Sequence, residues 1–314
     1  MNTLREAVDD YLRMRRHLGF KLHEAGLYLS DFVTFMEQHE APFVTRSLAL
    51  AWAQRSDNVL PSAWGTRLGH VRSFARHRQA TDPRTEVPEP GLLRFPPKRA
   101  KPYLYPDAQI LGLMEAALDM PSPNRLCTFL PRTYYCLFGL LAVSGLRVSE
   151  VRSLELRDVD LDAGVLTVRE SKCDRTRLVP LHATTREVLA DYIDRRKRHW
   201  ADRPVSNHLF VSSRGTPLDG ARIRLVFHRL SRRIGLRGED DSHGPRIHDL
   251  RHTFATRTLV NWYRCGKDPE RLLPVLSDYL GHVCIANTKY YIEGSPEVMR
   301  EAKGRLESRW EVQS

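Results

Sequence analysis

Cysteine is scarce in this sequence of 314 residues, and its five cysteines are scattered. No two of them form a Cys-x-x-Cys pair, and an odd number cannot pair completely. Zinc ribbons and disulfide frameworks need cysteines at close or paired spacings, so neither is indicated. Because a chain of this kind suits a reducing compartment, we expect a cytoplasmic protein.

Long apolar runs are also missing. The longest one, residues 134–143, is much shorter than the roughly 20 residues that a membrane-spanning helix needs. The first residues, Met-Asn-Thr-Leu-Arg-Glu, lack the apolar core of a secretory signal. We therefore expect no association with a membrane.

Motifs for nucleotide and metal chemistry are absent as well. The sequence has no P-loop, no glycine-rich dinucleotide fingerprint and no paired-carboxylate metal site, so none of these motifs indicates a cofactor or a metal. It does have basic charge: 49 Lys and Arg face 38 Asp and Glu, a net charge of +11. Such an excess favours a polyanionic partner, with nucleic acid the first candidate, although ordinary solubility is the alternative.

The spacing of apolar residues predicts a helical N-terminal domain over residues 1–82. Its last helix carries a basic face that suits DNA phosphates, and a solvated helix face is an equal alternative. The basic candidates on this helix are Arg67, Arg72, Arg76 and Arg78. Residues 83–106 hold seven prolines and predict an extended linker, whose Lys98, Arg99 and Lys101 could cross a DNA backbone.

Residues 107–314 predict a second, mainly α-helical domain with a small antiparallel sheet, an α+β arrangement. The expected strands are 154–161, 165–168 and 177–181, with a polar hairpin tip between the last two. The expected helices span 107–119, 131–143, 185–200, 220–234, and 247 to the end with breaks near 266–269 and 294–296. The last helix, 296–310, is amphipathic; it could pack on its own domain or on a neighbouring subunit.

One short motif organises the second domain. His248 and Arg251 are three residues apart, so they share a face of the helix that the pattern predicts. An imidazole beside a guanidinium suits a phosphate, because one group can handle a proton while the other binds charge. Alone, this spacing also fits an ordinary solvated helix face.

Further motifs follow one another in a fixed order. Ser-Gly-Leu-Arg-Val-Ser-Glu-Val contains Arg147, His-Asp-Leu-Arg-His-Thr-Phe-Ala-Thr spans 248–256, Leu-Gly-His ends at His282, and Tyr291 follows nine residues later. Lys172 precedes Arg-Leu-Val-Pro-Leu in the hairpin. Over residues 107–300 this set resembles the phage integrase, or tyrosine recombinase, family. The N-terminal part is similar to that family's core-binding domain by position and helical character only.

The resemblance implies a two-domain clamp around double-stranded DNA and a site-specific recombinase of integrase or transposase type. Tyr291 would form a 3′-phosphotyrosyl link and free a 5′-hydroxyl, without metal or ATP. Such proteins act as homo-oligomers, here a tetramer on two DNA sites, with other recombinases or accessory proteins as further partners.

The chemistry of these residues can also be argued directly. Developing charge on a phosphodiester needs fixed cations, and Arg147 and Arg251 offer planar forks for it. A free phenol has a pKa of about 10, so it needs a proton acceptor, for which His248 is our candidate. His282 could donate a further hydrogen bond, and Lys172 could protonate the leaving oxygen. Glu150 would orient neighbouring groups, since a carboxylate at the phosphate would repel it.

Each assignment has a plainer alternative. Arg147 could form only an ion pair with Glu150, and Lys172 could be one surface lysine among many. Tyr290, adjacent to Tyr291, is expected to be a packing residue. We expect His252 to pack or to cap structure, since it follows Arg251 directly and points elsewhere on the helix. We expect Asp249 to serve the helix N-terminus rather than a metal.

Two departures from the family pattern stand out. Arg251 and His282 are 31 residues apart, longer than is common, with the extra residues near 261–269, and Ile-Glu rather than Thr-His follows Tyr291. Three rival functions also remain at this stage. They are a type IB topoisomerase, a non-catalytic DNA-binding protein, and a metal phosphohydrolase built on His248, Asp249 and His282.

Overall fold

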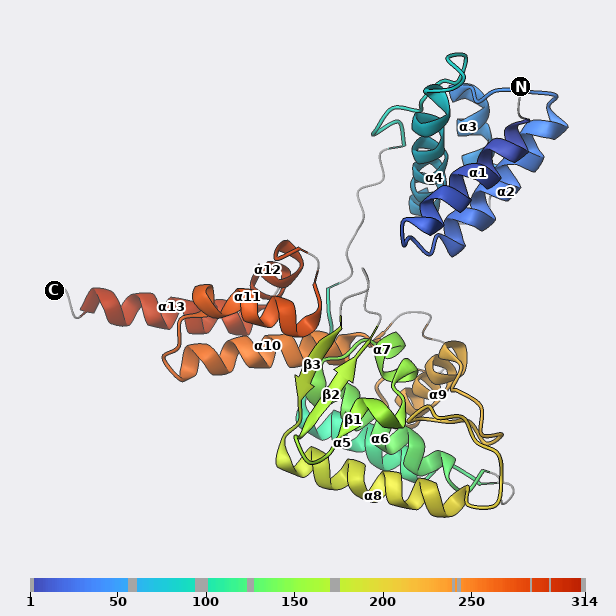
Figure 1. Ribbon diagram of the computed structural model, residues 1–314. Coiled ribbons are helices and arrows are strands. Elements are labelled where there is room, and N and C mark those ends of the chain that lie inside the picture. The colour runs from blue at the N-terminus through green and yellow to red at the C-terminus, as the bar shows by residue number, and fades with distance from the viewer. Residues whose placement is uncertain are drawn as a thin grey trace. The chain divides into compact units, whose positions relative to one another are not determined.

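The computed structural model describes residues 3–55, 61–93, 101–122, 127–169, 176–238, 241, 244–282, 284–293 and 295–311. The chain forms two compact units, an N-terminal unit, Met1–Ala100, and a C-terminal unit, Lys101–Ser314. Figure 1 shows the helices and strands of both units. No helix in the described ranges is both long and apolar enough to span a membrane.

The described part of the N-terminal unit is helical, as its apolar spacing predicts. Its helices are α1 (Leu4–His17), α2 (His23–Gln38), α3 (Arg46–Gln54) and α4 (Pro61–Gln79). Helix α1 begins at a capping box in which Thr3 and Glu6 each accept the other's backbone N–H. The helices enclose one core whose largest fully buried side chains are Phe32, Trp52 and Phe74.

At both ends of the expected linker, residues 83–106, the described residues pack on a unit. On the N-terminal side, the carbonyls of Pro88 and Glu89 accept hydrogen bonds from Arg72. On the C-terminal side, Tyr105 is buried, and its N–H donates to Thr253 Oγ1 at 3.0 Å. Between these ends, residues 94–100, with the predicted Lys98 and Arg99, lie outside the described residues.

The C-terminal unit starts with helices around a small sheet (Figure 1). They are α5 (Asp107–Leu118), α6 (Leu130–Ser144), α7 (Val148–Ser153), α8 (Ala183–His199) and α9 (Gly220–Arg233). Strands β1 (Val159–Asp160), β2 (Val165–Val168) and β3 (Arg177–Pro180) form an antiparallel sheet in the order β1-β2-β3. The register places Leu166 opposite Val179, and both side chains join the helices in the main core.

The first strand is much shorter than the predicted 154–161. Residues Leu156–Asp158 form a 3₁₀ turn, in which the Asp158 side chain accepts the N–H of Glu155 at 3.0 Å. Apolar residues at both ends of 154–161 face the core although the backbone between them is not extended. Their spacing therefore resembles that of a strand.

The last part of the chain folds into a second helical layer. It contains α10 (Asp249–Arg264), α11 (Pro269–Leu280), α12 (Ala286–Glu293) and α13 (Pro296–Glu311), and α10 packs against the other three. Val298 of α13 is fully buried in a core shared with α10 and α11, and Glu301 pairs with Arg264 at 2.8 Å. The first half of α13 therefore packs on its own unit. The extra residues between Arg251 and His282 form the last turn of α10 and the loop to α11.

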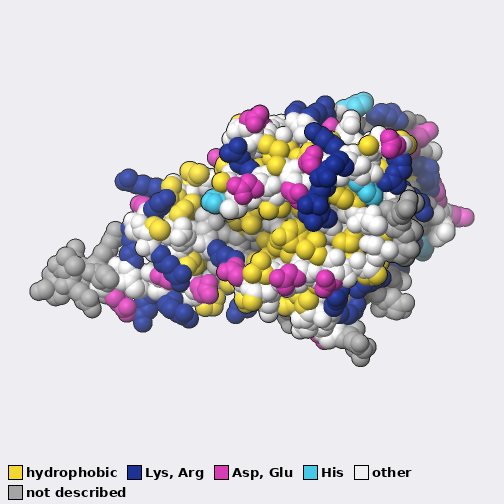
Figure 2. All heavy atoms as spheres, turned by 90° about the horizontal axis from the view of Figure 1, so that it is seen from below, with side chains coloured by type: hydrophobic (Ala, Val, Ile, Leu, Met, Phe, Trp, Pro, Cys, Tyr) yellow, Lys and Arg dark blue, Asp and Glu magenta, His cyan; other side chains and the backbone are white. Residues whose placement is uncertain are grey.

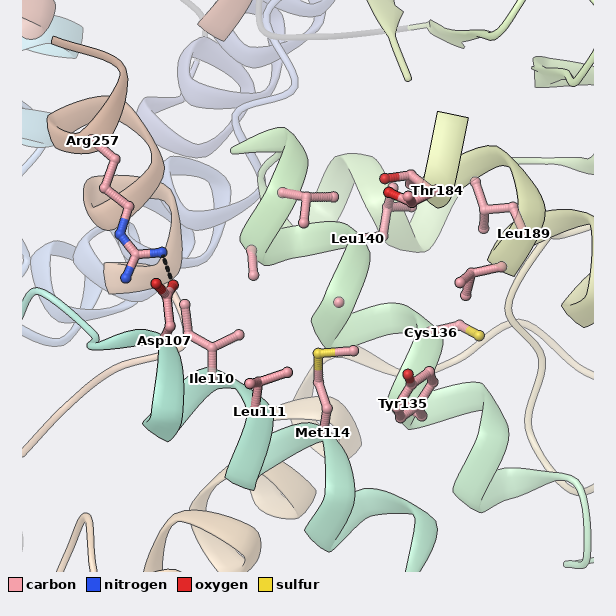
Figure 3. A pocket seen from close by; sticks show the side chains of 15 residues that line it. Asp107, Ile110, Leu111, Met114, Tyr135, Cys136, Leu140, Thr184, Leu189 and Arg257 are labelled. Atoms are coloured by element: carbon pink, nitrogen blue, oxygen red, sulfur yellow. Dashed lines mark hydrogen bonds and ion pairs between the residues drawn. The ribbon is translucent and has the colours of Figure 1, made fainter. Parts of the chain in front are cut away.

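The surface of the molecule mixes apolar and charged groups, and Figure 2 shows one face on which apolar side chains gather centrally. An apolar cavity of about 360 Å³ lies between α5, α6 and α8 (Figure 3). Arg257 and Asp107 form an ion pair at one end of it, and none of the predicted site residues lines it.

Candidate active site

The structure brings four of the sequence motifs together in the C-terminal unit. Arg147 precedes α7, Arg251 lies in the first turn of α10, His282 follows α11, and Tyr291 lies in α12. Since these elements are far apart in the sequence, their meeting is a property of the fold.

Arg251 is buried, with 2% of its surface exposed, and its guanidinium is held mainly by backbone carbonyls. Nη1 donates to the oxygen of Gly145 at 2.8 Å, and Nη2 donates to that of Leu280 at 2.6 Å. Nη2 also lies 2.9 Å from Nε2 of His282. The charge is thus fixed in place before any ligand binds, which is what stabilisation of a developing anion requires.

Arg147 is half-buried and shares its donors between a carboxylate and a carbonyl. Its Nη1 binds Glu150 Oε1 at 2.6 Å, its backbone N–H donates to Oε2 at 2.8 Å, and Nη2 donates to the oxygen of Gly281 at 2.8 Å. Burial alone would raise the pKa of Glu150, but hydrogen bonds from Arg177 and Arg147 hold it below its usual value. Glu150 is therefore an ionised group that orients its neighbours.

Arg177 is a member of this cluster that the sequence did not predict. Its Nη1 and Nη2 donate to the two Glu150 oxygens at 3.1 and 2.8 Å, and its Nε donates to the oxygen of Tyr279 at 2.8 Å. In the sequence it is one arginine at the start of a strand. No spacing relates it to Glu150, 27 residues earlier, so no local pattern could have identified it.

His282 lies between Arg251 and Thr288. Its Nδ1 is 2.7 Å from Thr288 Oγ1, and burial together with the Arg251 charge lowers its pKa to about 4. A guanidinium can only donate, so Nε2 accepts from Arg251 and Nδ1 carries the proton of a neutral ring. In this tautomer, Nε2 does not donate; the predicted donation to a phosphate requires another protonation state.

Tyr291 lies beside Arg251 and His282 of its own chain. Its ring is stacked on that of His282, with centroids 5.9 Å apart, and 4% of the residue is exposed. Burial lowers the pKa of Arg251, and a hydrogen bond that Arg251 donates to the Tyr291 oxygen acts in the opposite direction. The neighbouring Tyr290 is half-buried, with its ring 6.3 Å from that of Tyr291. The two phenols are therefore in different surroundings.

His252 packs against other side chains, as expected, but these belong to the site, so the expectation that it points elsewhere was wrong. Its ring lies 5.2 Å from that of Tyr291 and 5.1 Å from that of His248, because α12 packs along α10. Burial and the neighbouring His248 lower its pKa to about 4. His248 itself is exposed at the start of α10, and partial desolvation and Arg251 lower its pKa. His252 thus stands between His248 and the phenol.

Other predicted residues lie outside this cluster. Lys172, which follows β2 and precedes β3 in the sequence, lies outside the described residues, and Lys101 is exposed. In α4, Arg72 binds the carbonyls of Pro88 and Glu89, and Arg78 pairs with Asp82 at 3.7 Å. Arg67 lies over the ring of Tyr28 at 5.9 Å, and Arg76 is exposed. Arg67 also donates to the Ala53 oxygen at 3.5 Å, so three of the four arginines of this helix have partners in their own chain.

The arrangement does not form the metal site of the rival hydrolase. Asp249 is 1% exposed, and its carboxylate accepts the backbone N–H of Arg246 at 2.9 Å and the Arg246 guanidinium at 2.7 Å. Its oxygens are thus turned to the start of α10, as predicted. Across the described ranges, no three His, Cys, Asp or Glu side chains are grouped so as to hold a metal.

Comparison with known proteins gives a consistent family. The phage integrase family model matches residues 109–297. The chain is 57% identical over 311 residues to the integrase/recombinase y4rB of Sinorhizobium fredii, and the match covers 99% of both chains. It is 30% identical to tyrosine recombinase XerD of Staphylococcus aureus, with 96% of this chain and 98% of XerD covered. It shares its fold with the Tn1549 transposon integrase in complex with transposon right-end DNA, with a TM-score of 0.68, 19% identity, and coverage of 98% and 99%. The chain therefore belongs to the phage integrase family of tyrosine recombinases, and it is an enzyme that cleaves and rejoins DNA strands in site-specific recombination.

Proposed function

We propose that this recombinase acts on double-stranded DNA with Tyr291 as its nucleophile, in an integration or transposition reaction. The observation that carries the assignment is the burial of the Tyr291 ring beside Arg251 and His282 of the same chain. A phenol next to a fixed guanidinium is surrounded by positive charge, which favours its attack on phosphorus.

In the proposed step, the Tyr291 oxygen attacks the scissile phosphorus and the bond from phosphorus to the 5′-oxygen breaks. The phenol proton passes to an imidazole, for which His248 is our candidate with His252 between them. The 5′-oxygen leaves as a hydroxyl after taking a proton from Lys172. A 5′-hydroxyl of a partner duplex reverses these changes, so the phosphotyrosyl bond conserves the energy of the broken one.

Arg147 and Arg251 would bind the non-bridging phosphate oxygens during this step. Both keep part of the guanidinium fork in backbone contacts, which fixes the direction in which the rest of the group can donate. Glu150 would orient Arg147 and stay away from the phosphate.

The proposed partners are double-stranded DNA, further copies of this chain and accessory proteins. The Tn1549 integrase and the XerH recombinase were each solved with DNA, and we propose a duplex for this chain as well. The two units would clamp that duplex, with the exposed Arg76 and the basic residues at 98–101 near its backbone. We also propose that four copies of the chain assemble on two DNA sites in the cytoplasm, together with accessory proteins. A type IB topoisomerase is the alternative, and it would relax plasmids without site preference.

The test is covalent trapping on nicked duplexes that let the 5′-hydroxyl strand diffuse away. A randomised duplex pool incubated with the wild-type protein, followed by recovery of detergent-resistant adducts, identifies the DNA for the assay. Tyr291→Phe should abolish the adduct while DNA binding persists, and Tyr290→Phe, its matched control, should retain it. An adduct that persists in Tyr291→Phe and disappears in Tyr290→Phe would reverse the assignment.

A further inference from the structure

The C-terminal end of α11 meets three guanidinium groups. The carbonyl oxygen of Tyr279 accepts from Arg177, that of Leu280 from Arg251, and that of Gly281 from Arg147, at 2.6 to 2.8 Å. The last carbonyls of a helix have no partner within it and carry the negative end of its dipole. Three consecutive carbonyls thus each bind one arginine, two of which we place at the phosphate.

Arg177, the third arginine, also binds the carboxylate that orients Arg147. Its two terminal nitrogens face the two Glu150 oxygens, and Arg147 binds the same carboxylate. Arg177 and Glu150 expose only 11% and 6% of their side chains. An ion pair that excludes water in this way is costly to break, because the remaining charge stays buried without a partner.

Counting charges shows what Arg177 changes. One carboxylate faces two guanidiniums, so this group carries one net positive charge. If Arg177 lost its charge, Glu150 and Arg147 alone would sum to zero. Arg147 would then be attracted to a carboxylate whose charge no other cation compensates. The attraction of Arg147 for a phosphate would therefore fall.

The close packing around Gly281 makes the contact geometric as well as electrostatic. A Cβ placed on Gly281 would lie 2.8 Å from Arg177 Nη1 and 3.4 Å from Arg147 Nη1. The two guanidiniums therefore lie against the same glycine. With its left-handed φ of +65°, Gly281 is the C-cap of α11. A shift of Arg177 would be transmitted directly to Arg147.

We infer that Arg177 is a positioning residue for strand cleavage: it neutralises Glu150 and binds the end of α11, so that Arg147 stays charged and aligned toward the scissile phosphate. This inference rests on the proposed function, since it requires Arg147 to act on that phosphate. Arg177 itself does not touch the DNA in this role.

The experiment uses the full-length protein and the nicked duplex obtained by wild-type trapping. The rate of adduct formation is measured at saturating DNA for Arg177→Gln, Arg177→Lys and the matched control Arg169→Gln. Arg169 lies next to β2 and pairs with the buried Asp158, so its loss also breaks an arginine–carboxylate pair of this sheet. Each rate is measured on the normal phosphodiester and on a methylphosphonate, in which a methyl group removes the negative charge that Arg147 would stabilise.

On the phosphodiester, Arg177→Gln should slow adduct formation about tenfold or more, Arg177→Lys less, and Arg169→Gln hardly at all. On the methylphosphonate, the deficit of Arg177→Gln should shrink to about threefold or less, because little charge remains to be stabilised. A merely structural role predicts the same deficit on both substrates, and that result would overturn the inference.

Two further variants keep the outcome interpretable. If Arg177→Gln folds poorly in a thermal melt, the double variant Glu150→Gln/Arg177→Gln replaces it, since it removes both buried charges. Its rate should exceed that of Arg177→Gln, and a rate no higher counts against the inference. If Tyr291→Phe still forms the adduct, the proposed function fails, whereas a wild-type rate in Arg177→Gln with no adduct in Tyr291→Phe refutes only the role of Arg177.

Discussion

The two sides of the active site are built by different means. On one side, guanidinium groups are fixed by backbone carbonyls and a buried carboxylate, through hydrogen bonds of 2.6 to 3.1 Å. On the other side, imidazole and phenol rings lie face to face or edge to face, with centroids 5.1 to 5.9 Å apart. The guanidinium side keeps its charge, whereas the imidazoles have lowered pKa values and stay neutral.

This difference separates two tasks that a phosphoryl transfer requires. A charge that must stabilise an anion works best when it is already in place, and backbone carbonyls at helix ends are rigid acceptors. A group that must take and return a proton works best when it is neutral and can change its state. Substitutions on each side should show whether the two sides depend on these properties.

The largest effect is expected for Arg251→Lys. Lysine keeps the charge but cannot bind two carbonyls and His282 at once, so the rate of adduct formation should fall about 10² to 10³-fold. Arg257→Lys, six residues further along α10 and paired with Asp107, is the matched control and should stay near wild type. If the rate of adduct formation in Arg251→Lys falls by less than about tenfold, charge alone suffices on the guanidinium side.

Gly145→Ala should reduce the free energy of unfolding by about 3 kcal/mol. Gly145 has a φ of +62°, and an added Cβ would clash with the Phe254 ring. The carbonyl of Gly145 accepts a hydrogen bond from Arg251. Gly235→Ala has a φ of +73° with open space around it, so only the backbone cost of about 1 kcal/mol is expected. Denaturant unfolding measures the free energy of unfolding of both variants. Equal losses of this free energy would contradict tight packing on the guanidinium side.

Thr288→Val should lower the adduct rate about tenfold, since His282 would lose the hydroxyl that orients it. The Thr288 oxygen is 2.7 Å from His282 Nδ1 and is fully buried. Thr258→Val, which removes a hydroxyl bound to a helix carbonyl elsewhere on α10, serves as the control. Equal rates in the two variants would mean that His282 needs no orientation from Thr288.

The smallest effect concerns pH. His252 and His282 have pKa values of about 4 in the folded protein, below the unfolded value of 6.5. Between these values the unfolded chain binds more protons, so the stability that is present above pH 6.5 should be lost as the pH falls toward 4. His252→Phe should flatten this part of the unfolding curve measured against pH, and an unchanged slope would mean that His252 does not titrate in this way.

The sequence predicts the site best where residues occupy fixed positions within one motif. Its motifs indicate Arg147, Arg251, His282 and Tyr291, which the structure places together, and its periodicity predicts most helices within a few residues. No local pattern indicates Arg177 or the surroundings of His252, because the positions of both depend on partners in other elements. The prolines of 83–106 also do not reveal that Tyr105 is buried and hydrogen-bonded to α10.

The sequence by itself determined which reactive side chains exist, their order, and the helices and strands that carry them, because periodicity and motif spacing are local properties. Only the tertiary structure decided that one helix end binds three arginines and that His252 faces the phenol. Those contacts join residues 29 to 134 positions apart, and nothing in the local pattern relates such positions before the core has formed.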